Sequence, residues 1–154
     1  MKARARLAVL VVVLVGLAGV VAGSVYALTI ETQARGTFAL KHDQVELARG
    51  VARLIGEPTD AAVQKIVLGA GEGPGWHTHP GPAVVIVKTG SFTMVNDDCS
   101  EAAFEAGDVV VDQGFGNIHR AYNPGPGTTE VWVSYIVPQS AGLVIPSSAP
   151  DCVP

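Results

Sequence analysis

The stretch Gly75–Val85, GWHTHPGPAVV, carries the most informative pattern in the chain. His77 and His79 are two residues apart, so both side chains project to the same face if this stretch is a strand. A third histidine, His119, follows the glycine-rich turn Gly114–Gly116. Neutral imidazole suits zinc, copper, nickel and iron, so three converging histidines would make a metal site. We therefore predict that His77, His79 and His119 bind a divalent metal ion.

The alternative is that the three histidines are unrelated surface or core residues. The spacing of two residues behind a turn rich in glycine and proline, with a third histidine after a glycine loop, favours the metal site. The remaining histidine, His42, lies beside Lys41 and Asp43 and is expected to be solvated.

The sequence on both sides of this stretch predicts an all-β fold. Short apolar runs alternate with turns rich in glycine, asparagine and aspartate, which is typical of a sandwich or a barrel. After the N-terminal segment, no window of about 12 residues or more indicates a helix. Gln44–Ile55 fits either a pair of strands or a short helix. The expected strands are 63–68, 83–87, 91–95, 102–104, 109–112 and 129–137.

Length and charge limit the possible functions. The 154 residues suit one domain. Ten basic and 14 acidic residues give a net charge of −4, so electrostatic binding of nucleic acid is not expected. The sequence contains no nucleophile-elbow serine, no phosphate-binding loop and no Cys-x-x-Cys motif. The sequence therefore excludes several common chemistries, but it identifies neither a reaction nor its catalytic residues.

The N-terminus has the pattern of an export segment. Lys2, Arg4 and Arg6 precede 22 uncharged residues, Leu7–Leu28. We expect residues 1–27 to be a cleaved signal peptide. The alternative is an uncleaved membrane anchor, because 22 uncharged residues can span a bilayer. Both readings place the rest of the chain outside the cytoplasm, either secreted or anchored, with contact to a membrane only through the uncleaved segment.

The two cysteines, Cys99 and Cys152, both lie in the part predicted to be exported. In an oxidising compartment, an even pair is more often a disulfide than a metal site or a nucleophile. The bond would close a loop of about 53 residues and stabilise the fold by roughly 4 kcal/mol. Two unpaired thiols are the alternative.

The spacing of glycines and histidines over residues 71–123 resembles the two motifs of the cupin family. The first motif is matched by Gly71, His77-x-His79 and Gly90. The second is matched by Gly107, Gly116-x-x-His119 and Asn123. The pattern is most similar to small exported cupins with one cysteine between the motifs and another near the C-terminus.

This resemblance implies a single jelly-roll β-barrel with a metal pocket in its mouth. The expected organisation is a signal peptide or anchor at 1–27, a linker at 28–43, the barrel at 44–146 and a C-terminal tail at 147–154. The resemblance also allows a homodimer, since cupins often pair through edge strands.

The chain departs from the family pattern at Ala83, where the first cupin motif has a glutamate. The three remaining ligands are neutral, which favours zinc, iron, copper or nickel over harder ions. Other acidic residues near the motifs are Glu72, Asp112 and Glu130. Because acidic residues are mostly exposed, we expect these three to be surface or turn residues rather than members of the site.

The sequence thus predicts an exported cupin-domain protein that binds a divalent metal through three histidines in a small-molecule pocket, with no activity assigned. One alternative is a metal-dependent, dioxygenase-like enzyme that acts on a small chelating substrate. Another is a metal-free cupin that binds a ligand. A pocket lined by apolar residues such as Val85, Val87 and Phe115 would favour binding, whereas further polar side chains would favour an enzyme.

Overall fold

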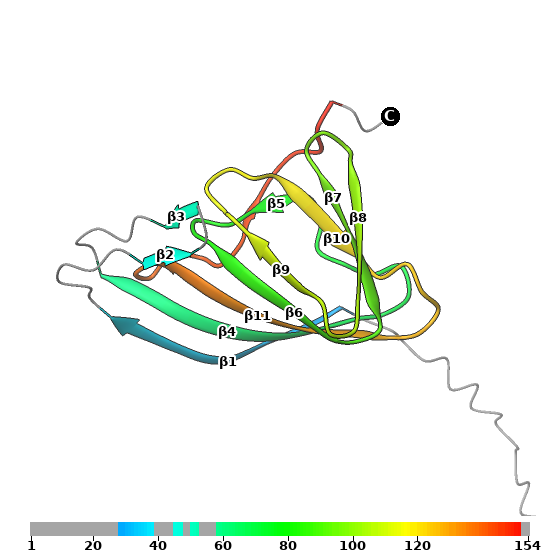
Figure 1. Cartoon of the computed structure of the whole chain (residues 1–154), viewed down its shortest axis with the longest axis horizontal. Helices are drawn as coiled ribbons and strands as arrows, with labels where there is room; N and C mark the ends of the chain where they lie inside the picture. Colours follow the sequence, from blue (N-terminus) through cyan, green and yellow to red (C-terminus); the bar gives the residue numbers. More distant parts are fainter. Residues whose placement is uncertain (1–27, 39–44, 48–49, 53–57, 152–154) are drawn as a thin grey trace, which may run out of the picture.

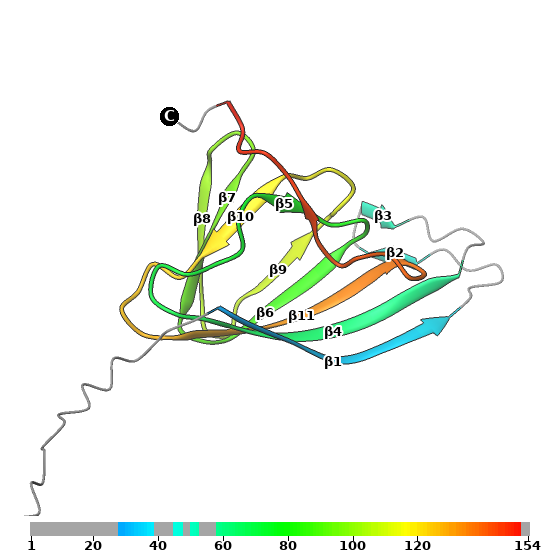
Figure 2. The ribbon, with the colours of Figure 1, turned by 180° about the vertical axis from the view of Figure 1, so that it is seen from behind.

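The structure is a computed structural model that describes residues 28–38, 45–47, 50–52 and 58–151. These residues form strands and turns without a helix, and so none of them belongs to a helix that could cross a membrane. Two five-stranded antiparallel sheets face each other, and a third sheet has two strands (Figures 1 and 2). The arrangement is a jelly roll of two facing sheets, the fold that the sequence resemblance implies.

The first large sheet has the strand order β1-β4-β11-β6-β9. Its strands are β1 (Thr29–Phe38), β4 (Thr59–Leu68), β6 (Ala83–Thr89), β9 (Val109–Asp112) and β11 (Thr129–Pro138). The long strands β4 and β11 pair along their whole length, from Thr129 opposite Leu68 to Pro138 opposite Thr59.

The second large sheet has the order β12-β5-β10-β7-β8. Its strands are β5 (His77–Thr78), β7 (Ser91–Asn96), β8 (Glu101–Glu105), β10 (His119–Tyr122) and β12 (Ile145–Pro146). The remaining strands, β2 (Val45–Leu47) and β3 (Gly50–Ala52), pair only with each other.

Alternating side chains create the core between the two large sheets. In β11, every second residue from Thr129 to Val137 is buried, because successive side chains of a strand point to opposite faces. The four from Val131 to Val137 form one buried cluster with Ala62, Ile66 and Leu68 of β4 and Val87 of β6. The second sheet contributes Phe92, whose ring stacks on Phe104 at a centroid distance of 5.2 Å. This buried cluster packs the two sheets against each other, and the three histidines face the space between the sheets.

The strands expected from the apolar runs are all present, and Gln44–Ile55 contains a strand pair where it is described. The linker expected at 28–43 is wrong over Thr29–Phe38, which forms β1 and pairs with β4. Its residues are almost all exposed, so the alternation that indicates a half-buried strand is missing. Main-chain pairing holds β1 in place, together with the ion pair between Arg35 and the buried Asp60.

Two predictions fall on residues outside the described ranges. The signal peptide or anchor at 1–27 is one of them. The other is the disulfide, because Cys152 lies beyond the last described residue. Both stay predictions.

Candidate metal centre

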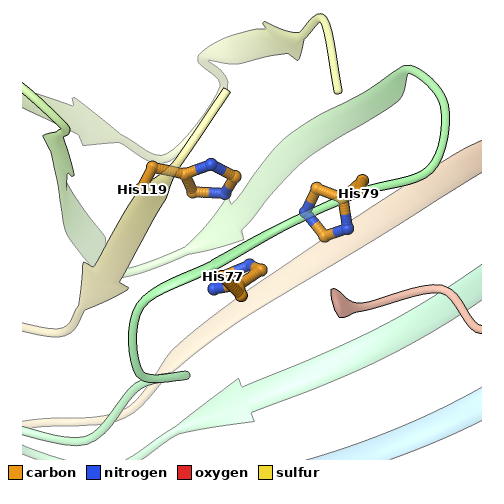
Figure 3. Close-up of side chains that lie close together, drawn as sticks. All are labelled: His77, His79 and His119. Carbon is orange, nitrogen blue, oxygen red and sulfur yellow. The ribbon is translucent and has the colours of Figure 1, made fainter. Parts of the chain in front are cut away.

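Strands β5 and β10 bring the three histidines together. His77 of β5 pairs directly opposite His119 of β10, so their side chains leave the sheet on the same face. His79 follows β5 with the same parity as His77. Figure 3 shows the three imidazole rings turned toward one another, two from the β5 segment and one from β10.

The three rings form a compact, buried group. Each histidine is only 5% exposed. The ring centroids are 4.4 Å apart for His77 and His119, 4.9 Å for His77 and His79, and 5.3 Å for His79 and His119. One nitrogen from each ring lies within 4.8 Å of the other two, which is close enough for all three to bind one metal ion.

Backbone carbonyls fix the orientation of every ring. The Nδ1 atoms of His77, His79 and His119 lie 2.6, 2.6 and 3.1 Å from the carbonyl oxygens of Gly75, Leu143 and Asn117, respectively. A carbonyl only accepts hydrogen bonds, so each Nδ1 must donate its proton. In the neutral imidazole, the lone pair is then on Nε2. Metal-binding histidines are commonly oriented in this way.

Burial keeps two of these imidazoles neutral. It lowers the pKa of His77 from 6.5 to about 4, opposed by the hydrogen bond to Gly75 and assisted by the neighbouring His119 and His79. It also lowers the pKa of His79, against the hydrogen bond to Leu143 and the charge of Asp112. At neutral pH both rings therefore have a free lone pair, as a metal ligand requires.

Asp112 was expected from the sequence to be a surface or turn residue, and this expectation is wrong. It is 3% exposed and lies on the inner face of β9. Its Oδ2 atom is 3.4 Å from Nε2 of His79 and 3.7 Å from Nε2 of His119. Three valines precede Asp112 in this strand, so the sequence does not show which residues of the strand face inward. For this reason Asp112 could not be recognised as part of the site.

The other acidic candidates lie away from the histidines, as expected. Glu72 is exposed. Glu130 pairs with Lys88 at 3.2 Å and Lys65 at 3.9 Å, and it accepts a hydrogen bond from Trp132. Among the described carboxylates, Asp112 is therefore the one that faces the histidines.

The histidines face a pocket between the two sheets, of about 700 Å³ with its open mouth included. Most of its lining is aliphatic or aromatic, with residues such as Ile66, Val85, Met94 and Val133. Val87 instead belongs to the buried core and Phe115 is 66% exposed, so of the three apolar residues expected in the lining only Val85 is there.

Polar groups in the lining, besides the histidines and Asp112, include Gln64 and Tyr135. The Tyr135 ring lies 5.3 Å from the His79 ring. Burial raises the pKa of Tyr135, and the charge of Asp112 adds to this effect. The phenol therefore stays protonated and can donate a hydrogen bond into the pocket.

The donor set fits a divalent transition metal. Three imidazole nitrogens directed at one point, with a carboxylate beside two of them, match the preferences of zinc, copper, nickel and ferrous iron. The metal ligands predicted from sequence are thus brought together, whereas binding of a metal and its identity stay predictions.

A comparison of the sequence with protein-family models found no match. No curated protein matches it either.

Several solved structures are similar to this chain. An uncharacterised conserved protein with a double-stranded β-helix domain from Klebsiella pneumoniae is 24% identical, with a TM-score of 0.48; the match covers 56% of this chain and 76% of that one. A Cupin 2 conserved barrel domain protein from Salinispora arenicola is 25% identical, with a TM-score of 0.46, and covers 52% and 65%. A cupin domain from Bordetella pertussis is 15% identical, with a TM-score of 0.48, and covers 72% and 94%.

Proposed function

We propose that this protein binds one divalent transition metal through Nε2 of His77, His79 and His119 and uses the adjoining pocket to hold a small ligand at the metal. The single observation that carries this proposal is the shared orientation of the rings. Each Nδ1 is hydrogen-bonded to a backbone carbonyl, which leaves the three Nε2 atoms directed inward from buried positions. Packing alone would not require all three rings to have this tautomer and direction.

The pocket supports a small ligand with a mainly apolar body. Twelve of its 18 lining residues are apolar, so the transfer of a hydrocarbon or aromatic portion from water into the pocket would be favourable. Of the polar lining groups, Asp112 and Tyr135 lie beside the histidines. A ligand with one oxygen or nitrogen donor could therefore place that atom at the metal and its apolar part against Val85, Met94 and Val133.

Export is part of the same proposal and rests on the sequence. The basic residues at positions 2, 4 and 6 and the uncharged segment behind them are typical of a signal peptide or an anchor. The functional setting would then be outside the cytoplasm. N-terminal sequencing of the protein recovered from the extracellular fraction tests this point, and a start near residue 28 would show cleavage.

Elemental analysis tests the metal site. Protein spanning residues 28–154 should contain about one zinc, copper, nickel or iron per chain. The variant His77→Ala/His79→Ala should lose it, whereas His42→Ala, which removes a histidine from outside the predicted site, should retain it. Absence of metal from the wild-type protein, even after reconstitution with each ion, would contradict the proposal.

A metal-dependent enzyme on a small chelating substrate is the second candidate, and Tyr135 is the observation that favours it. Its protonated phenol lies beside His79 and could hold a substrate oxygen in place. Oxygen uptake by the iron-loaded protein, with a panel of small diketones and hydroxy acids, tests this candidate. Oxygen uptake by the wild type that is reduced in the variant Tyr135→Phe would support the enzyme. If no compound of the panel causes oxygen uptake, metal-dependent ligand binding remains as the function.

A further inference from the structure

We infer that Asp112 is the fourth ligand of the metal centre and supplies the negative charge that the three histidines lack. This inference rests on the proposed function, because it assigns a ligand to the same metal. It differs from the sequence-based expectation, which placed no carboxylate at the site.

The first argument is the position of Asp112 on β9. Val110 and Asp112 are buried, whereas Val109 and Val111 are exposed, so Asp112 lies on the inward face of the strand. A carboxylate is rarely buried to this degree without a compensating partner. The side chain at 3% exposure therefore requires an explanation.

The second argument is that the two carboxylate oxygens have different environments. Oδ1 accepts hydrogen bonds from the Gly114 amide at 3.0 Å and from Nδ2 of Asn117 at 2.9 Å. Oδ2 is buried and has no hydrogen-bond partner among the described residues. The loop thus holds the carboxylate by one oxygen and directs the other toward the histidines.

The third argument is the chemistry of the atoms that face each other. An imidazole whose Nδ1 donates to a carbonyl can bind a cation only through Nε2, and Nε2 of His79 and of His119 faces Oδ2. A carboxylate oxygen and an unprotonated imidazole nitrogen are both acceptors, so they form no hydrogen bond with each other, whereas both can bind one cation. Electron-rich atoms turned toward one another in a buried site repel, and a cation placed between them removes the repulsion.

The distances favour shared ligation over hydrogen bonding. A charge-assisted hydrogen bond between imidazolium and carboxylate would be about 2.7–2.9 Å long. Two ligands of one tetrahedral ion, each about 2.0–2.1 Å from it, lie about 3.3–3.4 Å apart. The distances from Oδ2 to Nε2 of His79 and His119 are 3.4 and 3.7 Å. The separations of Oδ2 from both nitrogens are therefore closer to those of ligands that share one ion than to those of a hydrogen bond.

The sheet register shows why the carboxylate comes from β9. Ala83 of β6 is paired directly opposite Asp112, so both side chains are on the inward face. Ala83 is 1% exposed and its methyl group has no ligand atom. A small residue at 83 leaves the space beside the histidines to the side chain at 112.

Zinc affinity, measured by competition with a chromophoric chelator, tests this inference. The variant Asp112→Asn keeps an oxygen for the Gly114 and Asn117 hydrogen bonds and removes the charge. We expect its affinity for zinc to fall by about 100-fold or more, above the 10–100-fold range typical of residues that only orient a ligand. The cobalt(II)-loaded variant should also show a changed visible absorption spectrum. Glu105→Gln, which removes a charge from an exposed position, should bind zinc within about twofold of the wild type.

The possible results separate the two proposals. In the first case, the wild type binds zinc and cobalt and His77→Ala loses both. If Asp112→Asn then binds zinc within about threefold of the wild type, with an unchanged cobalt spectrum, Asp112 is not a ligand. The three-histidine site would still stand. If the wild type binds neither ion, the proposed function itself fails.

A measurement on the wild type covers the case in which Asp112→Asn does not fold. In a crystal structure of the zinc-loaded protein, Oδ2 should lie about 2.0–2.2 Å from the ion. A zinc ion bound by the three histidines with Oδ2 more than about 3 Å away would overturn the inference.

Discussion

The environment of His77 decides its protonation state. The ring is buried, donates from Nδ1 to the Gly75 carbonyl and lies against two other imidazoles. A positive charge there would be poorly solvated and would repel a protonated neighbour. The pKa of about 4 follows from these two effects, and it means that His77 can act as a ligand well below neutral pH.

This lowered pKa predicts how the stability of the metal-free protein depends on pH. In the unfolded chain, His77 titrates at about 6.5 and binds a proton that the folded state excludes until about pH 4. The contribution of His77 to the free energy of unfolding is therefore fully present above about pH 6.5. It is lost as the pH falls from about 6.5 to about 4. We expect a loss of about 2–3 kcal/mol from His77 between pH 7 and pH 4.

Urea unfolding in the presence of a chelator measures this effect. The variant His77→Gln should have a flatter dependence of unfolding free energy on pH than the wild type. A variant with the same slope as the wild type between pH 7 and pH 5 would contradict the assignment to His77.

At the scale of residues, the sequence predicted the histidines and missed Asp112. The spacing of His77 and His79 on one strand indicated a shared face, and their proximity to His119 is confirmed. For Asp112, the preceding residues are all valine, so periodicity could not tell the inward face from the outward one. The deciding information is the pairing of Asp112 with Ala83, which exists only in the folded sheet.

The turn that follows β9 is the element that positions the carboxylate. Gly114 has a φ of +65° and donates its amide proton to Oδ1 of Asp112. A Cβ at this position would lie 2.2 Å from the Gly81 carbonyl oxygen, and main chain cannot move away as a flexible side chain can. The close approach of two backbone segments therefore requires glycine here.

Substitution of this glycine should destabilise the fold. Gly114→Ala combines a strained φ with a backbone clash, and we expect it to lower the free energy of unfolding by about 3 kcal/mol or more. Gly107→Ala is the matched control, because its φ is +99° but no atom lies within 4 Å of the added Cβ. It should cost about 1 kcal/mol. Equal losses for both variants in urea unfolding would contradict the clash at Gly114.

The pairing of β6 with β9 predicts that the carboxylate can be moved between strands. Asp112→Ala should bind zinc weakly, and Ala83→Glu added to it should restore affinity by about tenfold or more, since both positions face the histidines. Competition with a chromophoric chelator measures both constants. A folded double variant that binds zinc no better than Asp112→Ala would contradict the shared face.

At the scale of elements, apolar runs predicted the interior strands because these have a hydrophobic pattern. Strand β1 has no such pattern and was expected to be a linker, yet it completes the edge of a sheet by pairing with β4. The short strands β5, β10 and β12 could not be bounded from sequence either. Their two to four residues are too few to show a period, and pairing with neighbours defines them.

At the scale of the whole molecule, the C-terminal segment forms part of the site. The Leu143 carbonyl accepts the hydrogen bond from Nδ1 of His79, and β12 pairs with β5 beside His77. Val144 also lines the pocket. The chain after β11 therefore returns to support the histidines, a contact between distant parts of the sequence that local patterns do not reveal.

A disulfide from Cys99 to Cys152 would tie this returning segment to the turn between β7 and β8. We expect the oxidised protein to be more stable than Cys99→Ser/Cys152→Ser by about 4 kcal/mol in urea unfolding. Mass spectrometry after alkylation without reductant should show no modified cysteine in the protein recovered from outside the cytoplasm. Alkylation of both cysteines under these conditions would contradict the bond.

The proposed function depends on the binding of one metal ion by three imidazoles. X-ray absorption at the edge of the metal found in the purified protein tests it most directly, because imidazole rings give a characteristic outer-shell scattering. We expect three imidazoles in the coordination shell, with metal–nitrogen distances of about 2.0–2.1 Å for zinc. A spectrum without imidazole scattering, from a metal bound elsewhere on the chain, would contradict it.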